Sequence, residues 1–432
     1  MAEVKPLRGL RYNTETIRDL ASVITPPYDI ITKEAQARYY ARHPYNIIRL
    51  ELGQEQPDDD TLDNVYTRAA ATFSEWRLQG TLRQEAAPCY YLYQQTFSHA
   101  GQSYTRTSLL GRVRVEPWSA RVVLPHENTL AKAREDRLRL LRACNANLSP
   151  IMSLYEDPQG RMRRLLNSYT ATAEIRIIDE DGVEHRLHPI TDAQQIALIQ
   201  DFFSQRQIYI ADGHHRYTTA LNYLDEIRAQ HSNLNPDDGV NFVLMALIDV
   251  DDPGMLVLPT HRLLSGLSPQ MLDNLAHLER YFHVTRLAPG DQQTLLNNLA
   301  EAGRQQPSLL ILTTDQALLL KLNAEGQKAM QASGHSDAWN ELDVAIVQYL
   351  LLEQSLGIST DDITAGRYVS YTHNDQEAFQ AVRSGGAQAV VMLNSTPLRQ
   401  VCAVAQADDR MPQKSTYLYP KLITGLVVNP LW

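Results

Sequence analysis

The residues best suited to chemistry form one short run, Asp212-Gly213-His214-His215-Arg216, directly after a β-prone segment at 208–210. Apolar side chains then recur at helical spacing, at Tyr217, Ala220, Leu221, Leu224 and Ile227. The pattern therefore predicts a strand, a tight turn at Gly213 and a helix with Asp212 as its N-cap. His214, His215 and Arg216 would then lie in the first helical turn. Backbone N–H groups and the helix dipole favour an anion there, and the guanidinium of Arg216 suits phosphate or carboxylate.

This run has a second interpretation, a capped helix whose first-turn polar side chains are only solvated. Local packing alone rarely needs an aspartate, two histidines and an arginine together. We therefore favour the anion site.

A second group of polar residues follows the predicted strand at 122–124, which breaks at Pro125. His126 and Glu127 lie at this corner, and His126 or Glu127 is the candidate base or proton donor. A histidine suits this role because it titrates near the working pH. A very basic helix comes next, and it carries the candidate phosphate-binding cations Lys132, Arg137 and Arg142. The same charges also fit an ordinary solvated helix face.

Three more segments carry candidate residues. His261 ends a partial echo of the 124–127 motif, and the polar run at 410–421 contains Lys414, Ser415 and Lys421, which suit either an anion site or an ordinary loop. Residues 48–52 alternate apolar and charged side chains, so we expect a strand that presents Arg49 and Glu51 on one face.

Hydrophobic periodicity, turn residues and capping patterns predict the elements that position these groups. Helices are expected at 33–42 after Thr32, at 66–79, from a capping box at Thr191-Asp192-Ala193-Gln194 to 203, and at 342–356. Hairpins are expected at 88–117, 174–189 and 309–322, and strands at 147–155, 240–250, 255–261, 367–371 and 389–393. The strand at 240–250 is nearly all apolar, which predicts burial on both faces.

Length and composition bound the class of protein. The chain has 432 residues, 44% of them hydrophobic and 21% charged, which favours at least two globular domains. Its net charge of −10 argues against general nucleic-acid binding. The cysteines, Cys89, Cys144 and Cys402, are widely spaced and suggest neither disulfides nor a zinc site. No apolar leader or membrane-length apolar run is present, so we expect a cytoplasmic protein without a membrane partner.

Several motifs together resemble one protein family. The run 211–217 resembles the signature of the prokaryotic family of domain of unknown function 1015, and further matches occur at Pro26-Pro27-Tyr28-Asp29, 45–50, 124–127 and 411–417. On these motifs the chain is identified as a member of that family. More distantly, Asp-Gly-His-His-Arg resembles the phosphate-binding turn of the ParB/sulfiredoxin-like superfamily, which includes nucleotide-dependent free-serine kinases.

The distant resemblance implies roles for individual residues. His214, His215 and Arg216 would be phosphate ligands, and Glu51 would match the carboxylate that activates the serine hydroxyl in the kinases. A histidine stands where sulfiredoxin has its working cysteine, so sulfinic-acid reduction is not expected. The acidic composition argues against ParB-like DNA binding.

We therefore expect a mixed α/β (α+β) fold with a ParB/sulfiredoxin-like mixed-sheet core. A first domain at residues 1–265, with its core at about 80–260, would be followed by a smaller α/β domain at 266–432 whose C-terminal segment returns to the site. The expected function is phosphoryl transfer or hydrolysis on a small phosphorylated metabolite, with serine or phosphoserine and a nucleotide as candidates. ATP or ADP is the candidate cofactor, and Mg²⁺ fits such chemistry although no ligand spacing singles it out. If His214 or His215 carried the phosphoryl group, the enzyme would be a phosphatase.

Two alternatives come from other classes. One is a metal-dependent hydrolase that uses His126, Asp212, His214 and His215, although adjacent helical histidines do not share a face. The other is a non-catalytic nucleotide or anion sensor that signals to the C-terminal domain. The sequence leaves open the substrate, the direction of transfer and the oligomeric state, a homodimer included. Finally, we expect His126, His214 or His215, Arg216 and Lys414 or Lys421 to line one cleft, because a dianion needs several donors around it.

Overall fold

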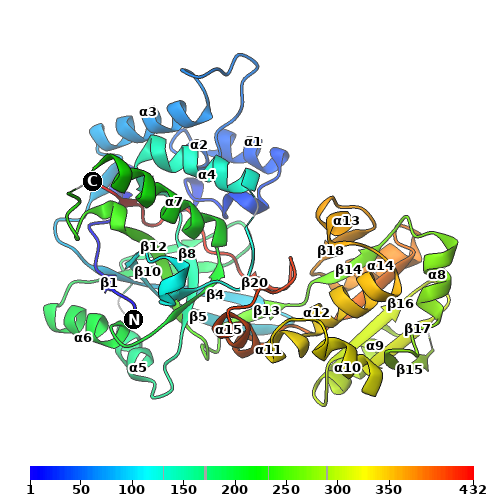
Figure 1. Ribbon diagram of the computed structural model, residues 1–432. Coiled ribbons are helices and arrows are strands. Elements are labelled where there is room, and N and C mark those ends of the chain that lie inside the picture. The colour runs from blue at the N-terminus through cyan, green and yellow to red at the C-terminus, as the bar shows by residue number, and fades with distance from the viewer. Residues whose placement is uncertain (130, 170–172, 232, 289) are drawn as a thin grey trace. The chain divides into compact units, whose positions relative to one another are not determined.

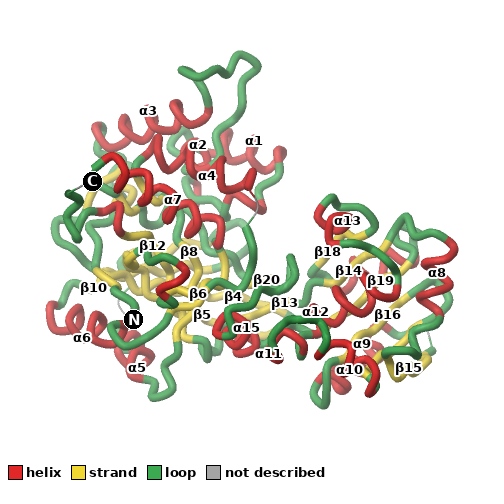
Figure 2. The backbone as a smooth tube through the Cα atoms, in the orientation of Figure 1, coloured by secondary structure: helices red, strands yellow, loops and turns green. Residues whose placement is uncertain are grey.

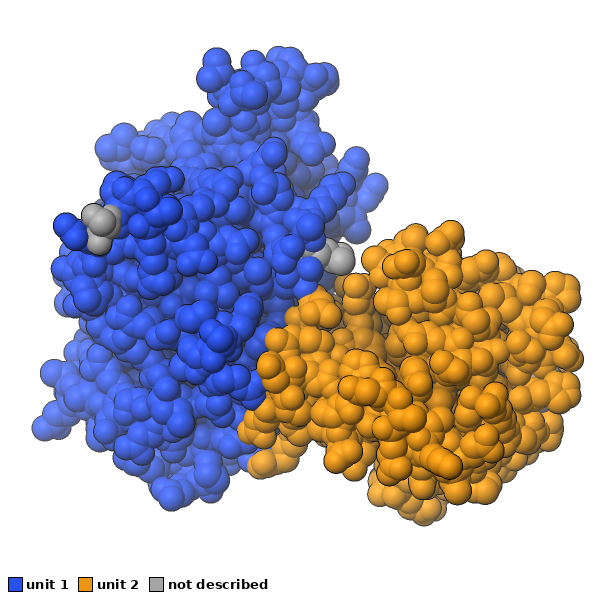
Figure 3. All heavy atoms as spheres, in the orientation of Figure 1, with its two compact units in different colours: residues 1–125, 129–255, 420–432 blue, residues 126–128, 256–419 orange. Residues whose placement is uncertain are grey.

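The computed structural model describes residues 1–432 except 130, 170–172, 232 and 289. These residues form two compact units (Figure 3). Unit 1 contains Met1–Pro125, Thr129–Met255 and Pro420–Trp432, and unit 2 contains His126–Asn128 and Leu256–Tyr419. The last segment of the chain thus belongs to the same unit as the first.

Among the described residues, unit 1 is built on a nine-stranded sheet with the order β6-β11-β8-β12-β5-β4-β10-β9, and β1 pairs with β5. The strands are β1 (Val4–Lys5), β4 (Tyr90–His99), β5 (Gln102–Arg114), β6 (Val123–Leu124), β8 (Ile151–Tyr155), β9 (Ile175–Ile178), β10 (Glu184–Ile190), β11 (Ile208–Asp212) and β12 (Phe242–Asp249). β11 is parallel to β6 and antiparallel to β8, whereas β8 is parallel to β12. Two short pairs, β2 (Leu10–Tyr12) with β3 (Leu82–Gln84) and β7 (Ala146–Asn147) with β21 (Asn429–Pro430), lie outside this sheet.

The α-helices of unit 1 are α1 (Lys33–Arg42), α2 (Ile48–Glu51), α3 (Val65–Leu78), α4 (Ala131–Cys144), α5 (Arg161–Asn167), α6 (Ala193–Phe203) and α7 (His214–Gln230). Of these, α4 to α7 share a hydrophobic cluster with this sheet, whereas α2 and α3 belong to a second cluster outside it. Figure 1 shows α3, α4 and α7 above the sheet and α5 and α6 below it. Leu138 and Leu141 of α4 share one hydrophobic cluster with Tyr217 and Leu224 of α7, and this packing fixes the start of α7 relative to the strands.

Unit 2 contains a six-stranded antiparallel sheet, β15-β17-β16-β19-β14-β18, within the described part of the chain. Its strands are β14 (His261–Leu264), β15 (Phe282–Leu287), β16 (Ser308–Leu312), β17 (Ala317–Leu322), β18 (Val369–Thr372) and β19 (Ala389–Leu393), and β13 (Leu256–Leu258) pairs separately with β20 (Tyr417–Tyr419). Its helices are α8 (Pro269–Ala276), α9 (Gln292–Gly303), α10 (Ala324–Gln331), α11 (Asp337–Asn340), α12 (Asp343–Ile346), the π-helix η5 (Val347–Ser355), α13 (Thr360–Thr364), α14 (Asp375–Arg383) and α15 (Leu398–Gln406).

Alternating residues of these strands enter two separate cores. In β16, Leu309 and Ile311 pack with η5, whereas Leu310 and Leu312 pack with α9 and α14. Successive strand side chains point to opposite faces, so both faces of the sheet are covered by helices.

The predicted fold class is confirmed: the chain is a mixed α/β protein with a large mixed sheet and a separate, smaller antiparallel sheet (Figure 2). The prediction of a strand buried on both faces is also confirmed, because every residue of β12 is buried. No helix among the described residues is both long and apolar enough to cross a lipid bilayer.

One predicted strand is wrong. Residues 48–51 form the short helix α2, and Ile48, Leu50 and Glu51 are all buried. The side chain of Asn46 accepts a hydrogen bond from the backbone N of Ile48 at 3.0 Å and donates one to the carbonyl of Ser22 at 2.8 Å. These two bonds favour a helical turn at this point, and Glu51 therefore lies inside the unit rather than on a solvated strand face.

Two predicted caps also differ. Gly213, not Asp212, is the N-cap of α7, and Asp212 is the last residue of β11. Helix α6 is capped by Asp192, whose carboxylate accepts from the backbone N of Gln195 at 2.9 Å, and not by Thr191. The carboxylate of Asp212 accepts a hydrogen bond from Lys421 instead.

Candidate functional site

The turn between β11 and α7 places the predicted anion-binding residues at a helix start. Gly213 has a φ of +101°, a left-handed conformation that glycine adopts without steric cost. Helix α7 begins at His214, so His214, His215 and Arg216 occupy its first turn, as predicted. No side chain caps this helix among the described residues. The first-turn N–H groups have no carbonyl partner within the helix, so this end favours a negatively charged group.

Arg216 is folded back over this turn. Its Nη1 donates to Ser149 Oγ at 3.2 Å and to the carbonyl of Pro150 at 2.5 Å. A Cβ atom on Gly213 would lie only 2.9 Å from Arg216 Nη2, so the glycine leaves the space that the guanidinium occupies. Both of these hydrogen bonds use Nη1, so among the described residues Nε and Nη2 remain available to donate to an anion.

Ser149 connects Arg216 to Glu51. Its hydroxyl donates to Glu51 Oε1 at 3.0 Å while it accepts from Arg216. Glu51 is only 3% exposed, and a buried carboxylate requires compensating partners. The chain Glu51–Ser149–Arg216 thus joins α2, the segment before β8, and the start of α7.

Arg137 supplies the second cation beside Glu51. Its Nη1 donates to the Glu51 carbonyl at 2.9 Å and lies 3.6 Å from the carboxylate Oε1. The guanidinium carbon also lies 4.0 Å from the ring centroid of Tyr28. Burial alone would lower the pKa of Arg137, but the carboxylates of Glu51 and Asp136 outweigh it and raise that pKa. Arg137 therefore stays charged at every working pH.

A small cavity adjoins these groups. It has a volume of about 50 Å³, and Glu51, Arg137, Ser149, Arg216 and Thr219 are among the residues that line it. This volume is on the order of that of a few water molecules. A carboxylate and two guanidinium groups therefore line one small cavity, all within unit 1.

Asp212 is paired with Lys421. Lys421 Nζ donates to Asp212 Oδ2 at 2.8 Å. Burial alone would raise the pKa of Asp212, but the positive charges of Lys421 and Arg216 outweigh it and hold that pKa well below its ordinary value. Asp212 is consequently an anion, a poor proton donor, and an acceptor already occupied by an ammonium group.

A buried arginine holds the backbone next to Lys421. Arg106 is 1% exposed, and its Nη2 donates to the carbonyl of Pro420 at 2.6 Å and to the side chain of Gln95. Gln95 Nε2 in turn donates to the carbonyl of Lys421 at 2.9 Å. Burial lowers the pKa of Arg106 to about 10, which still leaves it charged at neutral pH. Arg106 and Gln95 therefore fix the segment that carries Lys421.

The other predicted cations of α4 have different surroundings. Lys132 is exposed, and Arg142 makes a two-point ion pair with Glu226, with distances of 2.9 and 2.6 Å. Arg142 is 43% exposed, so this pair is a surface contact between α4 and α7. Of the basic residues predicted on this helix, only Arg137 adjoins Glu51 and Arg216 at the cavity.

The remaining predicted residues belong to unit 2. His126 is buried, and its carbonyl accepts from the backbone N of Met411 at 2.8 Å. His261 is fully buried in β14, where Nε2 lies 2.8 Å from Asp375 Oδ1 and Nδ1 lies 3.2 Å from the backbone N of Leu393. These bonds give His261 a structural role in the smaller sheet.

Three further residues of unit 2 were singled out. Glu127 is partly exposed, Lys414 is exposed with a φ of +56°, and Ser415 is buried with its hydroxyl bonded to the carbonyl of Pro412. The convergence of His126 and Lys414 with Arg216 in one cleft stays a prediction.

Sequence reasoning missed Ser149, Arg106 and the position of Tyr28. Ser149-Pro150 directly precedes residues 151–155 of the predicted strand, and this position was the available signal. Tyr28 lies in the Pro26-Pro27-Tyr28-Asp29 motif, which carries the family resemblance but gives no sign of a contact with Arg137. Arg106 carried no signal, because a charged residue in a hairpin is normally solvated.

Comparisons with known proteins give a family and only low structural similarity. No curated protein matches the chain. A conserved hypothetical protein from Pyrococcus furiosus is 12% identical, with a TM-score of 0.37 over 75% of this chain and 97% of that one. A free serine kinase in complex with AMP is 10% identical, with a TM-score of 0.37 over 74% of this chain and 91% of that one. SbnI from Staphylococcus aureus, truncated at its C-terminus, is 12% identical, with a TM-score of 0.35 over 74% and 87%.

The family model is a separate comparison. The model described as "Protein of unknown function (DUF1015)" matches residues 4–345, which is most of the chain and includes both Glu51 and the 212–216 motif. The chain belongs to this DUF1015 family.

Proposed function

We propose that unit 1 binds a phosphate group at the start of α7 and that the protein catalyses phosphoryl transfer on a small metabolite. Serine with a nucleotide donor, or phosphoserine in the hydrolytic direction, is the substrate pair that we put forward. Such reactions depend on positioned cations at the phosphate and on a group that orients or deprotonates the nucleophile.

The observation that supports this proposal is the hydrogen-bonded chain from Glu51 through Ser149 to Arg216. It places the Glu51 carboxylate and the guanidinium groups of Arg137 and Arg216 beside one small cavity, with Arg216 in the first turn of α7. The cations would bind the phosphate, and the carboxylate would accept the proton of an attacking hydroxyl. In this scheme Arg216 donates to the transferred phosphate through Nε and Nη2, while Nη1 stays bonded to Ser149 and Pro150.

The other residues have supporting roles in the scheme. Arg137 would pair with Glu51 and hold its carboxylate in place. His214 and His215 would add donors at the first turn of α7, and Lys421 would keep Asp212 oriented beside them. A nucleotide donor, ATP or ADP, would bring Mg²⁺ bound through its own phosphates.

A structural network alone could also account for buried Glu51 and Arg137, since a buried carboxylate needs partners in any protein. The substitution Glu51→Gln separates the two roles. It retains an oxygen that can accept from Ser149 but removes the base, so turnover should fall by about 10²-fold or more. Binding of the phosphate ligand should be kept.

The assay uses ³¹P NMR to detect the products formed by the purified full-length protein from ATP and serine, and separately from phosphoserine. Appearance of phosphoserine or of inorganic phosphate in the wild type, and its loss in Glu51→Gln, is the expected result. Glu135→Gln, which changes an exposed carboxylate on α4, is the matched control and should leave the rate unchanged. Equal rates for wild type and Glu51→Gln, with both proteins folded, would contradict the proposal.

A further inference from the structure

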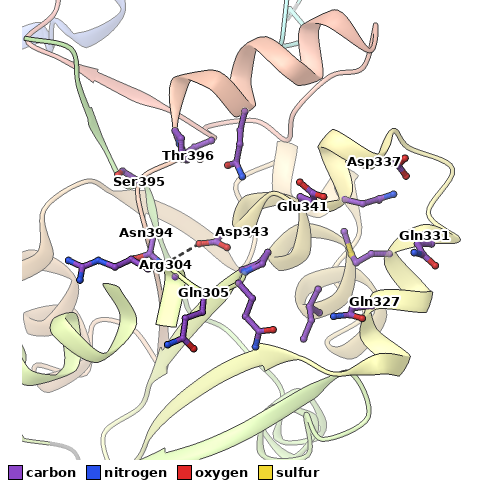
Figure 4. Close-up of a pocket in the computed structure, with 18 residues that line it drawn as sticks. Arg304, Gln305, Gln327, Gln331, Asp337, Glu341, Asp343, Asn394, Ser395 and Thr396 are labelled. Carbon is purple, nitrogen blue, oxygen red and sulfur yellow. Dashed lines mark hydrogen bonds between the residues drawn. The ribbon is translucent and has the colours of Figure 1, made fainter. Parts of the chain in front are cut away.

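Unit 2 has a large polar cavity of its own. It has a volume of about 690 Å³, which lies within the range of small-molecule binding pockets. Its walls come from the ends of α9 and α10, from the segment that joins α11 to α12, and from the residues after β19 (Figure 4). All of these segments belong to unit 2. The cavity is thus distinct from the site proposed in unit 1.

Side-chain amides dominate the lining. Gln305, Gln327, Gln331 and Gln400 line this space, and the first three are exposed. Asn340 is 9% exposed, and its Oδ1 accepts from Ser333 Oγ at 2.8 Å. The oxygens of these amide side chains are hydrogen-bond acceptors, and their NH₂ groups are donors.

The charged groups in the lining are mainly negative. Three carboxylates, Asp337, Glu341 and Asp343, adjoin the cavity, against a single guanidinium, Arg304. Figure 4 shows Arg304 extending to the opposite side from Glu341 and Asp337. Asp343 is the most enclosed of the three, and burial raises its pKa to about 6. A bound cation would offset the cost of burying that carboxylate.

One glycine shapes this wall. A Cβ atom on Gly303 would lie 2.4 Å from Asn394 Nδ2, so only glycine lets the Asn394 side chain occupy its place. From there, Asn394 Nδ2 lies 3.4 Å from Asp343 Oδ2. The carboxylate and the amide are therefore held side by side at one end of the cavity.

The apolar part of the lining is aliphatic. Leu322, Met330, Pro307 and Pro397 contribute it, and none of the described lining residues is aromatic. Nucleobases and other flat rings bind chiefly by stacking on aromatic side chains, so this cavity does not suit them. An alkyl chain between hydrogen-bonding cationic ends fits both parts of the lining.

We propose that this cavity binds a small aliphatic amine, with its ammonium groups held by the carboxylates of Asp343 and Glu341 and by amide oxygens. This proposal does not depend on the activity proposed for unit 1. Carboxylates and amide oxygens supply the acceptors that an ammonium group, with three donors and no acceptor, requires.

Calorimetric titration of the full-length protein tests the proposal with three probes of equal chain length. These are 1,4-diaminobutane, neutral 1,4-butanediol and the dianion succinate. The diamine should bind, and the diol and succinate should each bind at least about tenfold more weakly, the effect expected from about one lost charge-assisted hydrogen bond. No heat from the diamine at millimolar concentration, or equal binding of the diol, would overturn it.

Variants locate the site. Glu341→Gln changes an exposed side chain and should not affect folding, yet it should weaken diamine binding about tenfold. Asp343→Asn should weaken it at least as much. Glu325→Gln on α10 alters a carboxylate paired with Arg280 outside the cavity lining and is the matched control. Unchanged affinity in both Glu341→Gln and Asp343→Asn would overturn the assignment to this cavity.

Discussion

Lys421 Nζ donates to Asp212 Oδ2 at 2.8 Å, although the two residues are 209 positions apart. The contact joins the C-terminal segment of the chain to the residue that precedes the turn into α7. Asp212 consequently serves as an ion-pair partner, not as the helix cap that its sequence position suggested. Because the Asp212 carboxylate is only 21% exposed, loss of the Lys421 ammonium group should lower the stability of the protein and make the surroundings of Arg216 more negative.

Removal of this cation should give a stability loss that depends on pH. Lys421→Met keeps the length of the side chain and should lower the free energy of unfolding by about 1–3 kcal/mol at neutral pH. The pKa of Asp212 is depressed in the folded state. A group of this kind contributes stability above its unfolded pKa of about 3.9 and loses it as pH falls through the folded pKa.

Urea unfolding at several pH values measures this effect. The difference between wild type and Lys421→Met should be full above about pH 5 and should shrink below about pH 4. A difference that grew toward acid pH would contradict the ion pair. Lys414→Met, which changes an exposed lysine of the same C-terminal run in unit 2, is the control and should have little effect at any pH.

The glycine at the start of α7 makes a second prediction. Gly213→Ala should destabilise the protein by about 1–2 kcal/mol because of its positive φ, and by more because the new methyl group meets Arg216 at 2.9 Å. Gly101→Ala is a matched control, since Gly101 also has a positive φ of +76° but has no atom within 4 Å of the added Cβ. The difference between the two midpoints of urea unfolding isolates the contact with Arg216. Equal losses would contradict the close packing of the guanidinium on the turn.

Local patterns predicted the elements that carry the site but not the contacts within it. The 3.6-residue period after Gly213 identified α7, and the all-apolar run at 240–250 identified β12, because these signals repeat over many residues. The alternation at 48–52 predicted a strand for Glu51. Five residues of alternation are too few to outweigh a local turn, so this prediction was wrong. The Asn46 side chain and the burial of Ile48 and Leu50 decided that conformation.

Partners distant in sequence could not be predicted at all. Nothing near Lys421 indicates that Asp212 is its acceptor, and nothing near Arg106 indicates that the carbonyl of Pro420 is. These pairings depend on how the C-terminal segment returns to unit 1, which is a property of the whole fold. The motif at 212–216 could be recognised for its chemistry, whereas the groups around it required the structure.

Arg216 should bind the phosphate in the proposed function. Arg216→Ala should weaken binding of a phosphorylated ligand such as ATP or phosphoserine by about 1.5–3 kcal/mol, the usual effect of a lost charge-assisted contact. Arg139→Ala removes an exposed arginine that pairs only with Glu135 on the same helix and is the control. Calorimetric titration of the two variants measures the difference. An unchanged affinity in folded Arg216→Ala would contradict the proposed anion site at the start of α7.

Removal of the Ser149 hydroxyl tests the two hydrogen bonds that connect Glu51 to Arg216. Ser149→Ala deletes one donor to Glu51 and one acceptor from Arg216, so it should cost about 1–3 kcal/mol of stability. Ser153→Ala is a matched control, because Ser153 is a buried serine of β8 whose hydroxyl donates to the sulfur of Met245 at 3.3 Å. A weak hydrogen bond to a thioether should cost less to remove.

Stability alone does not identify a role in catalysis, so the same two variants should be compared in the ³¹P NMR assay. If Ser149 orients both Glu51 and Arg216 for the reaction, Ser149→Ala should lower kcat while the folded fraction remains unchanged at the assay temperature. Ser153→Ala should leave kcat near that of the wild type. If Ser149→Ala loses stability but keeps full kcat, the chain from Glu51 to Arg216 holds the fold together and does not position reacting groups.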